Sequence, residues 1–304
     1  MYSLVYRLYF YLKRKQKKKR KSKLEKKIID RIEWFYNIPV REWYMRHAFT
    51  KKGTNMKSRG KKIIVSLTSY PKRIDTIWLT IETLLHQTVK PDMVILWLAE
   101  EQFSGYNALP DTLLKLRERG LTIKFCDDLR SHKKYFYTMQ EYSEDIIILV
   151  DDDMFYPYDT IEKLIKLHEK YPNDVCTMTA QVMEHNKLPS EWKNPKLGKK
   201  YEHSDKIQIF SGSGSLYPPH SICKEAFDKK AIQSYCPYAD DLWLTYMALK
   251  NNTKITMQNP WRAFPVTIYG TGDGSLYYIN AEAGQNDEQW KKIIEWDRGY
   301  KWDV

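Results

Sequence analysis

Two acidic clusters hold the residues of this 304-residue chain that are best suited to chemistry. The first is Asp151, Asp152 and Asp153, which directly follow the aliphatic run IIILV at 146–150. Three carboxylates at the end of a buried strand need positive charge nearby, because burying them unpaired is costly or forces protonation. Asp151 and Asp153 share one face if the extended backbone continues. They therefore predict a site for a divalent cation, Mg²⁺ or Mn²⁺, which binds carboxylates together with substrate phosphates. The alternative is a cap for the helix that follows.

The second cluster is Asp240 and Asp241 in YADDLWLTY, at the expected start of a helix. Acids in a first turn stabilise a helix, and either carboxylate is also suited to be a general base. Between the clusters, SGSGSLYPP at 211–219 is either a turn or a stretch where glycine permits close approach to the backbone. Trp243 and Trp192 either offer a ligand a flat apolar face or belong to the core.

Alternating strands and helices must position these clusters. Apolar strands are expected at 63–70, 93–99, 121–128 and 146–150, with helices at 74–86, 110–120, 134–142 and 159–172. This order predicts an α/β fold with a mostly parallel central sheet flanked by helices on both faces. Because ligands bind outside the carboxyl ends of such strands, Ser69, Asp128 and the triple aspartate should lie on one rim. Later, a helix is expected at 240–252 and strands near 207 and 254–261.

The N-terminus differs from this body in composition. Residues 1–12 are mostly aromatic and aliphatic, too few for the roughly 20 residues of a spanning helix. Residues 7–23 contain ten Lys and Arg without an acid, so they account for all but +2 of the net charge of +12. The basic run follows the apolar one, unlike a secretory signal. Residues 1–23 therefore predict a tail attached to the anionic, cytoplasmic face of a membrane.

A disordered tail and a nucleic-acid arm are the alternatives for residues 1–23. No nucleic-acid partner is expected, because the body lacks a basic helix with interleaved aromatics. Residues 24–61 are expected to form a helical extension and a linker, with the helix beginning at Leu24 and ending near Pro39. Four scattered cysteines without a CxxC pair are typical of buried thiols in a reducing compartment.

The order of the motifs resembles a known family of enzymes. SLTSYPKRI after the first strand, VILWLA in the second, DD at the end of the third and IIILVDDDM at the fourth resemble nucleotide-sugar glycosyltransferases of the Rossmann-like GT-A fold, most closely the family 2-like bacterial enzymes. The resemblance covers roughly residues 62–260. It implies a glycosyltransferase domain at 62–304, with a nucleotide-binding half at 62–155 and an acceptor half at 156–304.

The resemblance also implies roles for individual residues. Asp151 and Asp153, with Asp152 between them, would hold a metal that bridges the donor's diphosphate. An inverting transfer would use Asp241 as its general base, with Asp240 as the alternative. The remaining roles are nucleotide binding by Thr68, Ser69, Tyr70, Arg73, Asp128, Lys134 and Asp152, and contact with donor sugar or acceptor by Gly212, Ser213, Gly214 and Trp243.

One feature departs from the family's pattern. Many GT-A enzymes add a C-terminal histidine to the metal, whereas the last histidine here is His220. Water, His203 or His220 would then complete the metal site. The segment 267–290, glycine-rich at its start, would be a mobile lid.

The sequence thus predicts a metal-dependent, hexosyltransferase-like enzyme, peripheral on the inner face of the cell membrane. It would move a sugar from a nucleotide diphosphate donor, most simply a UDP-sugar, to a glycan or lipid-linked acceptor. The family analogy points to capsule, lipopolysaccharide or other surface polysaccharide assembly. One alternative is a phosphatase or phosphotransferase of the haloacid dehalogenase type, although Met154 stands where those enzymes have Gly or Thr. The other is a non-catalytic basic scaffold for membrane or nucleic acid, which leaves both acidic clusters unexplained.

Overall fold

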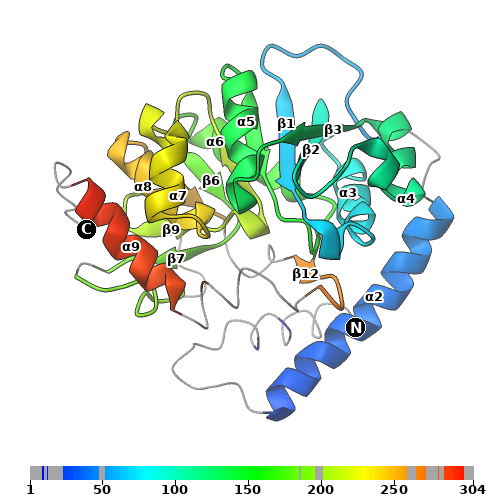
Figure 1. Ribbon diagram of the computed structural model, residues 1–304, viewed down its shortest axis with the longest axis horizontal. Helices are drawn as coiled ribbons and strands as arrows, with labels where there is room; N and C mark the ends of the chain where they lie inside the picture. The colour runs from blue at the N-terminus through cyan, green and yellow to red at the C-terminus, as the bar shows by residue number, and fades with distance from the viewer. Residues whose placement is uncertain are drawn as a thin grey trace.

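The computed structural model describes residues 9, 12, 23–47, 52–184, 186–195, 201–258, 265–271, 280 and 284–297. Its centre is an eight-stranded sheet in the order β3-β2-β1-β4-β10-β6-β11-β8. Figure 1 labels β1, β2, β3 and β6 of this sheet. The strands are β1 (Ile63–Thr68), β2 (Met93–Ala99), β3 (Leu121–Cys126), β4 (Ile146–Leu149), β6 (Val175–Thr177), β8 (Tyr201–Ser204), β10 (Ser215–Tyr217) and β11 (Ile255–Met257).

Six of the eight strands run in the same direction. β1 pairs in parallel with β2 and β4, β2 pairs in parallel with β3, and β6 does so with β11. β10 is antiparallel to both β4 and β6, and β8 is antiparallel to β11 at the edge. The predicted α/β class with a mostly parallel central sheet is therefore confirmed. β4 is buried along its whole length, which is why its sequence is aliphatic without alternation.

Helices cover both faces of the sheet, and each face has its own apolar cluster. Ile64 of β1 belongs to one cluster, with α5, α7, α8 and α9, whereas Val65 belongs to the other, with α3 and α6. These helices are α3 (Ile77–Leu85), α5 (Lys133–Glu141), α6 (Thr160–Lys170), α7 (Lys229–Tyr235), α8 (Asp240–Lys250) and α9 (Gln285–Trp296).

Shorter elements complete the described chain. α4 (Asp111–Leu114) precedes β3, and two small ladders join β5 (Met154–Phe155) to β12 (Val266–Thr267) and β7 (Ala180–Val182) to β9 (Ile207–Ile209). The 3₁₀ turns are η1 (Pro71–Arg73), η2 (Tyr106–Ala108), η3 (Lys115–Arg119), η4 (Arg130–His132), η5 (Ser211–Ser213) and η6 (Lys224–Phe227).

The N-terminal helix α2 (Lys23–His47) is longer than predicted, because it continues through Pro39 to His47. Proline removes one backbone hydrogen bond and usually ends a helix. Here Tyr36 before it and Val40 and Tyr44 after it pack against the apolar cluster on the α3 face, so the helix is held on both sides of the proline. The predicted end near Pro39 is wrong for this reason.

The predicted membrane tail, residues 1–23, lies outside the described residues except for Tyr9, Leu12 and the start of α2. Tyr9 and Leu12 are buried and pack with Ile29 and Val266. The Tyr9 hydroxyl also donates to Glu33 Oε1 at 2.9 Å. These two residues therefore face the body and not a membrane interface, while the prediction for the rest of residues 1–23 stays a prediction. Among the described helices, none has the length and apolarity needed to span a bilayer.

Candidate active site

Asp152, the middle residue of the triple aspartate, is an internal anchor. Its carboxylate accepts hydrogen bonds from Ser69 Oγ and from Arg73 Nη1, each at 2.5 Å, and its backbone carbonyl accepts one from Thr80 Oγ1 at 2.9 Å. The loop after β1 is thereby tied to the end of β4, as expected of two neighbouring parallel strands. Because both Asp152 oxygens are engaged within the protein, the cofactor-binding role predicted for this residue is not supported.

Arg73 supplies positive charge to the acids. Its Nη2 lies 3.0 Å from Asp153 Oδ2 and donates to the Thr271 carbonyl at 3.0 Å. Burial alone would lower the pKa of the guanidinium, but Asp152 and Asp153 outweigh it and the pKa is raised. Arg73 therefore stays charged and holds both acids in place.

Lys134 joins the two acidic clusters. Its Nζ, on α5, donates to Asp151 Oδ1 at 2.6 Å and lies 3.0 Å from Asp240 Oδ2 at the start of α8. Only 3% of the side chain is exposed. Burial would lower the pKa of Lys134, but Asp151 and Asp240 outweigh it and the pKa is raised. The lysine predicted to lie near a nucleotide is thus the centre of an ionic network.

The glycine-rich turn η5 lies between the same two clusters. A Cβ on Gly212 would come within 2.4 Å of Asp151 Oδ2, so a side chain at this position would displace the carboxylate. The Tyr156 hydroxyl donates to the Gly212 carbonyl at 2.9 Å and accepts from the Asp151 N–H at 2.8 Å. The Ser211 N–H donates to Asp241 Oδ1 at 2.8 Å. Both acidic clusters therefore contact η5.

The carboxyl groups of Asp240 and Asp241 have opposite pKa shifts. Burial would raise the pKa of Asp240, but Lys134 outweighs it and the pKa is lowered. Burial raises the pKa of Asp241 to about 7, and the charges of Asp240 and Asp151 add to the rise. Neighbouring carboxyls with divergent pKa values are typical of acid–base sites. At neutral pH Asp241 can take up or release a proton, whereas Asp240 remains ionised.

The acids fit a metal ion that takes most of its ligands from outside the protein. Within the described ranges, no three His, Cys, Asp or Glu side chains gather closely enough to form a protein cage. Mg²⁺ and similar cations commonly use one or two carboxylates together with phosphates and water. Asp151 suits this, because its side chain is 40% exposed and its Oδ2 lies in the space left by Gly212. Asp153, beside Arg73, is the second carboxylate on this rim.

Asp128 lies on the same rim, at the far side of the parallel strands. β3 and β4 are three strand positions apart in the sheet, which corresponds to about 14 Å at the usual spacing. Asp128 accepts hydrogen bonds from Lys133 Nζ at 2.6 Å and from the Arg130 N–H at 2.8 Å, and these contacts outweigh burial and lower its pKa. On β1 and β2, which lie between β3 and β4, the Thr68 hydroxyl donates to the Trp97 carbonyl at 2.8 Å. Tyr70, half-buried, lies under the Arg73 guanidinium.

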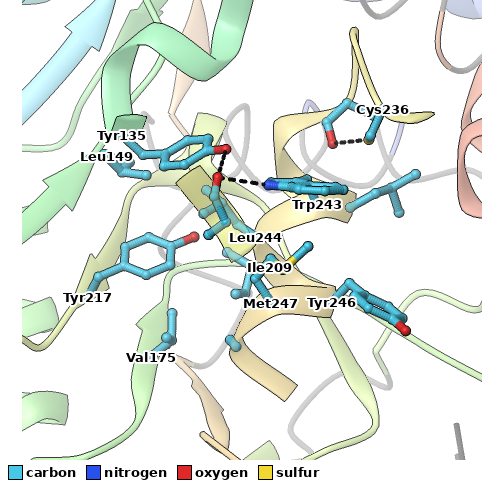
Figure 2. Packing of buried hydrophobic residues seen from close by; sticks show 14 of the residues in the cluster. Tyr135, Leu149, Val175, Ile209, Tyr217, Cys236, Trp243, Leu244, Tyr246 and Met247 are labelled. Carbon is cyan, nitrogen blue, oxygen red and sulfur yellow. Dashed lines mark hydrogen bonds between the residues drawn. The ribbon is translucent and has the colours of Figure 1, made fainter. Parts of the chain in front are cut away.

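Other predicted sugar-binding residues are internal. Trp243 is fully buried, with its Nε1 donating to the Ala226 carbonyl that also accepts from Tyr135 (Figure 2). Trp192 packs edge-on against Trp290 in the same cluster. Neither indole has a free face for a sugar, so these two predictions are wrong.

Of the three residues of the glycine-rich stretch that were predicted to contact sugar, Gly212 is the one that lies against an acid. Ser213 is buried and accepts a hydrogen bond from Thr179 Oγ1. Gly214 has a φ of +101°, and a Cβ there would point at Thr160 in the core. Ser213 and Gly214 therefore shape the turn, and their predicted contact with sugar is not supported.

Neither candidate histidine lies at the acids. His203 is on β8 at the sheet edge, paired with Asp174 at 2.9 Å. His220 pairs with Glu144, which precedes β4 and so lies at the opposite end of that strand from the triple aspartate. The suggestion that either completes a metal site is wrong. Most of the predicted lid, 267–290, lies outside the described residues.

Tyr156 and Thr80 are site residues that the sequence reasoning missed. Tyr156 connects Asp151 with Gly212, and Thr80 anchors the backbone of Asp152. Thr80 could have been noticed in the sequence, because it is a hydroxyl residue within the apolar helix IWLTIETLL. For Tyr156 there was no pattern beyond its closeness to the acids.

Comparisons with known proteins give likenesses in structure alone. No protein-family model matches the chain, and no curated protein matches it. The structure of S. aureus TarS 1-349 in complex with UDP-GlcNAc matches at 14% identity and a TM-score of 0.45, covering 67% of this chain and 57% of that one. Mannosyltransferase PcManGT from Pyrobaculum calidifontis, in complex with GDP-Man and Mn²⁺, matches at 12% identity and a TM-score of 0.43, covering 86% and 72%. At these values the likenesses assign neither a family nor an activity, and the chain spans little more than half of the first structure.

Proposed function

We propose that the chain is a family 2-like, metal-dependent glycosyltransferase that moves a sugar from a nucleotide diphosphate donor, most simply a UDP-sugar, to a hydroxyl of a glycan or lipid-linked acceptor. One observation carries the proposal. A metal-competent acid, a glycine that gives access to it and a carboxyl with a pKa near 7 are brought together from three distant segments around buried Lys134. Carboxyls whose pKa is raised by burial and by a neighbouring acid cluster at functional sites.

The donor end of the site would use Asp151 and Asp153. These carboxylates would hold Mn²⁺ or Mg²⁺, which when bound neutralises the charge of the departing diphosphate. Arg73 and Lys134 pair with these acids and orient them whether or not a cation is present. The nucleotide would lie along the rim toward Asp128, over the loop that contains Thr68 and Tyr70.

Asp241 would be the general base of an inverting transfer. Its carboxylate would take the acceptor hydroxyl's proton while that oxygen bonds to the anomeric carbon. The bond from this carbon to the diphosphate oxygen breaks at the same time, and the diphosphate leaves with the electron pair. A base with a pKa of about 7 suits a reaction near neutral pH. Asp240, kept ionised by Lys134, would hold that pKa up.

The remaining assignments belong to the same proposal. Residues 62–155 would be the nucleotide-binding half and 156–304 the acceptor half of one domain. The basic tail, residues 1–23, would attach the enzyme to the inner face of the cell membrane, where lipid-linked acceptors of surface polysaccharide synthesis are available.

Release of nucleotide diphosphate from a panel of nucleotide sugars, with Mn²⁺, tests the activity. Asp241→Asn should lower turnover by about 10² to 10⁴, the usual contribution of a general base, and should leave nucleotide binding intact. The matched control is Asp205→Asn, because Asp205 pairs with Lys254 beside the far edge of the sheet. Full turnover in Asp241→Asn would refute its assignment as base. No turnover of any nucleotide sugar by the parent chain would refute the proposed function.

A further inference from the structure

One side of α2 exposes large apolar side chains to solvent. At about 100° per residue, five of them fall on this side together with four cations, and all nine are exposed. Glu42, which pairs loosely with Arg46 at 3.9 Å, is the acid among them, and Asp30 lies at the margin. We call this side the outer face of α2; its apolar members are Leu24, Trp34, Phe35, Ile38 and Met45, and its cations are Lys27, Arg31, Arg41 and Arg46.

The opposite side of α2 is already occupied. Ile29 is buried and packs with Tyr9, Leu12 and Val266, while Tyr36 packs against the α3 face of the sheet. Figure 1 shows α2 along the outer edge of the molecule, beside β12. The helix therefore needs no further packing to stay on the body. Phe35 is nevertheless 62% exposed, and such an apolar side on a fixed helix is typical of an interaction site.

We propose that the outer face of α2 docks on an anionic lipid surface. Interfacial helices combine Trp, Phe and Leu, which enter the headgroup region, with Lys and Arg, which attract anionic lipids. The outer face has both kinds of side chain, over a helix about 37 Å long. The basic run of residues 13–23 leads directly into its first turn, which adds charge of the same sign.

The charges also argue against a second copy of the chain as the occupant. Two outer faces brought together would place four cations against four, with Glu42 as the compensating acid on each side. An anionic bilayer neutralises the same cations. The inference concerns α2 and goes beyond the attachment proposed for residues 1–23. It holds whether or not the catalytic proposal is correct.

Co-sedimentation of the full chain with vesicles tests the inference. Vesicles of phosphatidylcholine with phosphatidylglycerol are compared with vesicles of phosphatidylcholine alone. The apolar variant is Trp34→Ser/Phe35→Ser/Ile38→Ser, and its control, Met56→Ser/Tyr158→Ser/Ile294→Ser, changes three apolar side chains that are exposed elsewhere. The charge variant is Lys27→Gln/Arg31→Gln/Arg41→Gln, and its control, Lys206→Gln/Lys224→Gln/Lys230→Gln, removes three exposed lysines from other surfaces.

Both outer-face variants should bind the anionic vesicles at least tenfold more weakly than the parent. The charge variant loses three basic residues, each of which contributes about fivefold to binding near such a surface. The apolar variant loses the side chains that enter the headgroup region. Both controls should stay within about twofold of the parent. Circular dichroism should be unchanged in all four, and nucleotide binding in the same samples reports on the catalytic site separately.

Three results would overturn the inference. In the first, the parent does not bind anionic vesicles. In the second, both outer-face variants bind these vesicles as tightly as the parent does, so that the tail would be the attachment. In the third, the parent dimerises in analytical ultracentrifugation, the apolar variant is monomeric, and lipid binding is unchanged. The occupant would then be a second copy.

Discussion

Lys134→Met removes the cation that joins the two acidic clusters. Methionine has a similar length and keeps the apolar contacts, so the change mainly leaves Asp151 and Asp240 without their shared partner. The two carboxylates do not lose equally. The Asp151 side chain is 40% exposed and remains partly solvated, whereas that of Asp240 is 10% exposed. Most of the cost therefore comes from Asp240.

Breaking a buried ion pair by removing one partner costs about 3 to 5 kcal/mol. Because Asp151 remains partly solvated, we expect the lower end, about 3 kcal/mol, in urea unfolding at neutral pH. The matched control is Lys124→Met, which removes a partly exposed lysine from its pair with Glu141 and should cost about 1 kcal/mol or less. A second variant, Lys134→Met/Asp240→Asn, should recover part of the loss, since the unpaired charge is gone.

The loss should also depend on pH. The pKa of Asp240 is lowered in the parent, so its pair with Lys134 contributes stability above the unfolded pKa, and this is lost as the pH falls through the folded pKa. The difference between parent and Lys134→Met should therefore shrink as the pH falls below the ordinary pKa of an aspartate. A loss no larger than that of Lys124→Met, or one that is equal at neutral and acidic pH, would refute the network described around Lys134.

Three further predictions concern Asp241 and Gly212. Turnover should fall as the pH drops below about 7, because protonated Asp241 cannot accept a proton. A value of kcat/KM that stays the same from neutral pH into mild acid would contradict this prediction. At a pH above 7, Asp241→Asn should have a higher unfolding temperature than the parent, and in acid the two should unfold at the same temperature. The reason is that a folded pKa above the unfolded pKa destabilises the protein only where the carboxyl is ionised. Thermal unfolding scans of both proteins at an alkaline and an acidic pH test this prediction. Gly212→Ala should weaken metal-dependent nucleotide binding at least tenfold by displacing Asp151, whereas Gly60→Ala, with open space around it, should leave it unchanged; equal affinities in calorimetry would exclude a role for this contact.

The strands and the position of the triple aspartate could be predicted because both follow from local sequence. A parallel strand buried on both faces needs consecutive aliphatic residues, and IIILV supplies them in front of the acids. Once four such strands are found, the rule that carboxyl ends share one edge brings Ser69, Asp128 and Asp151 to a common rim.

The partners of adjacent lysines could not be predicted. Lys133 pairs with Asp128, and Lys134 with Asp151 and Asp240, because α5 lies across the sheet with these two side chains pointing to different strand ends. The spacing of residues in the sequence does not reveal how α5 is rotated about its axis, and so does not show where these two side chains point. Trp243 was misassigned for a related reason. α8 is buried on nearly every side, so its sequence has no polar face to show which residues point inward.

The length of α2 depended on tertiary contacts as well. A proline at position 39 is a stop signal in local sequence, and contacts with the body override it. The same contacts determine which side of α2 is covered, and therefore which apolar residues remain exposed.

The central claim is that the triple aspartate binds a nucleotide diphosphate through a divalent cation. Calorimetric titration of the full chain with uridine diphosphate, with and without Mn²⁺, tests it most directly, beside Asp153→Asn and the control Asp205→Asn. We predict binding that requires Mn²⁺, is lost in Asp153→Asn and is retained in Asp205→Asn. Binding that is indifferent to Mn²⁺ and to Asp153, or no binding of uridine, guanosine, adenosine, cytidine or thymidine diphosphate, would contradict the claim.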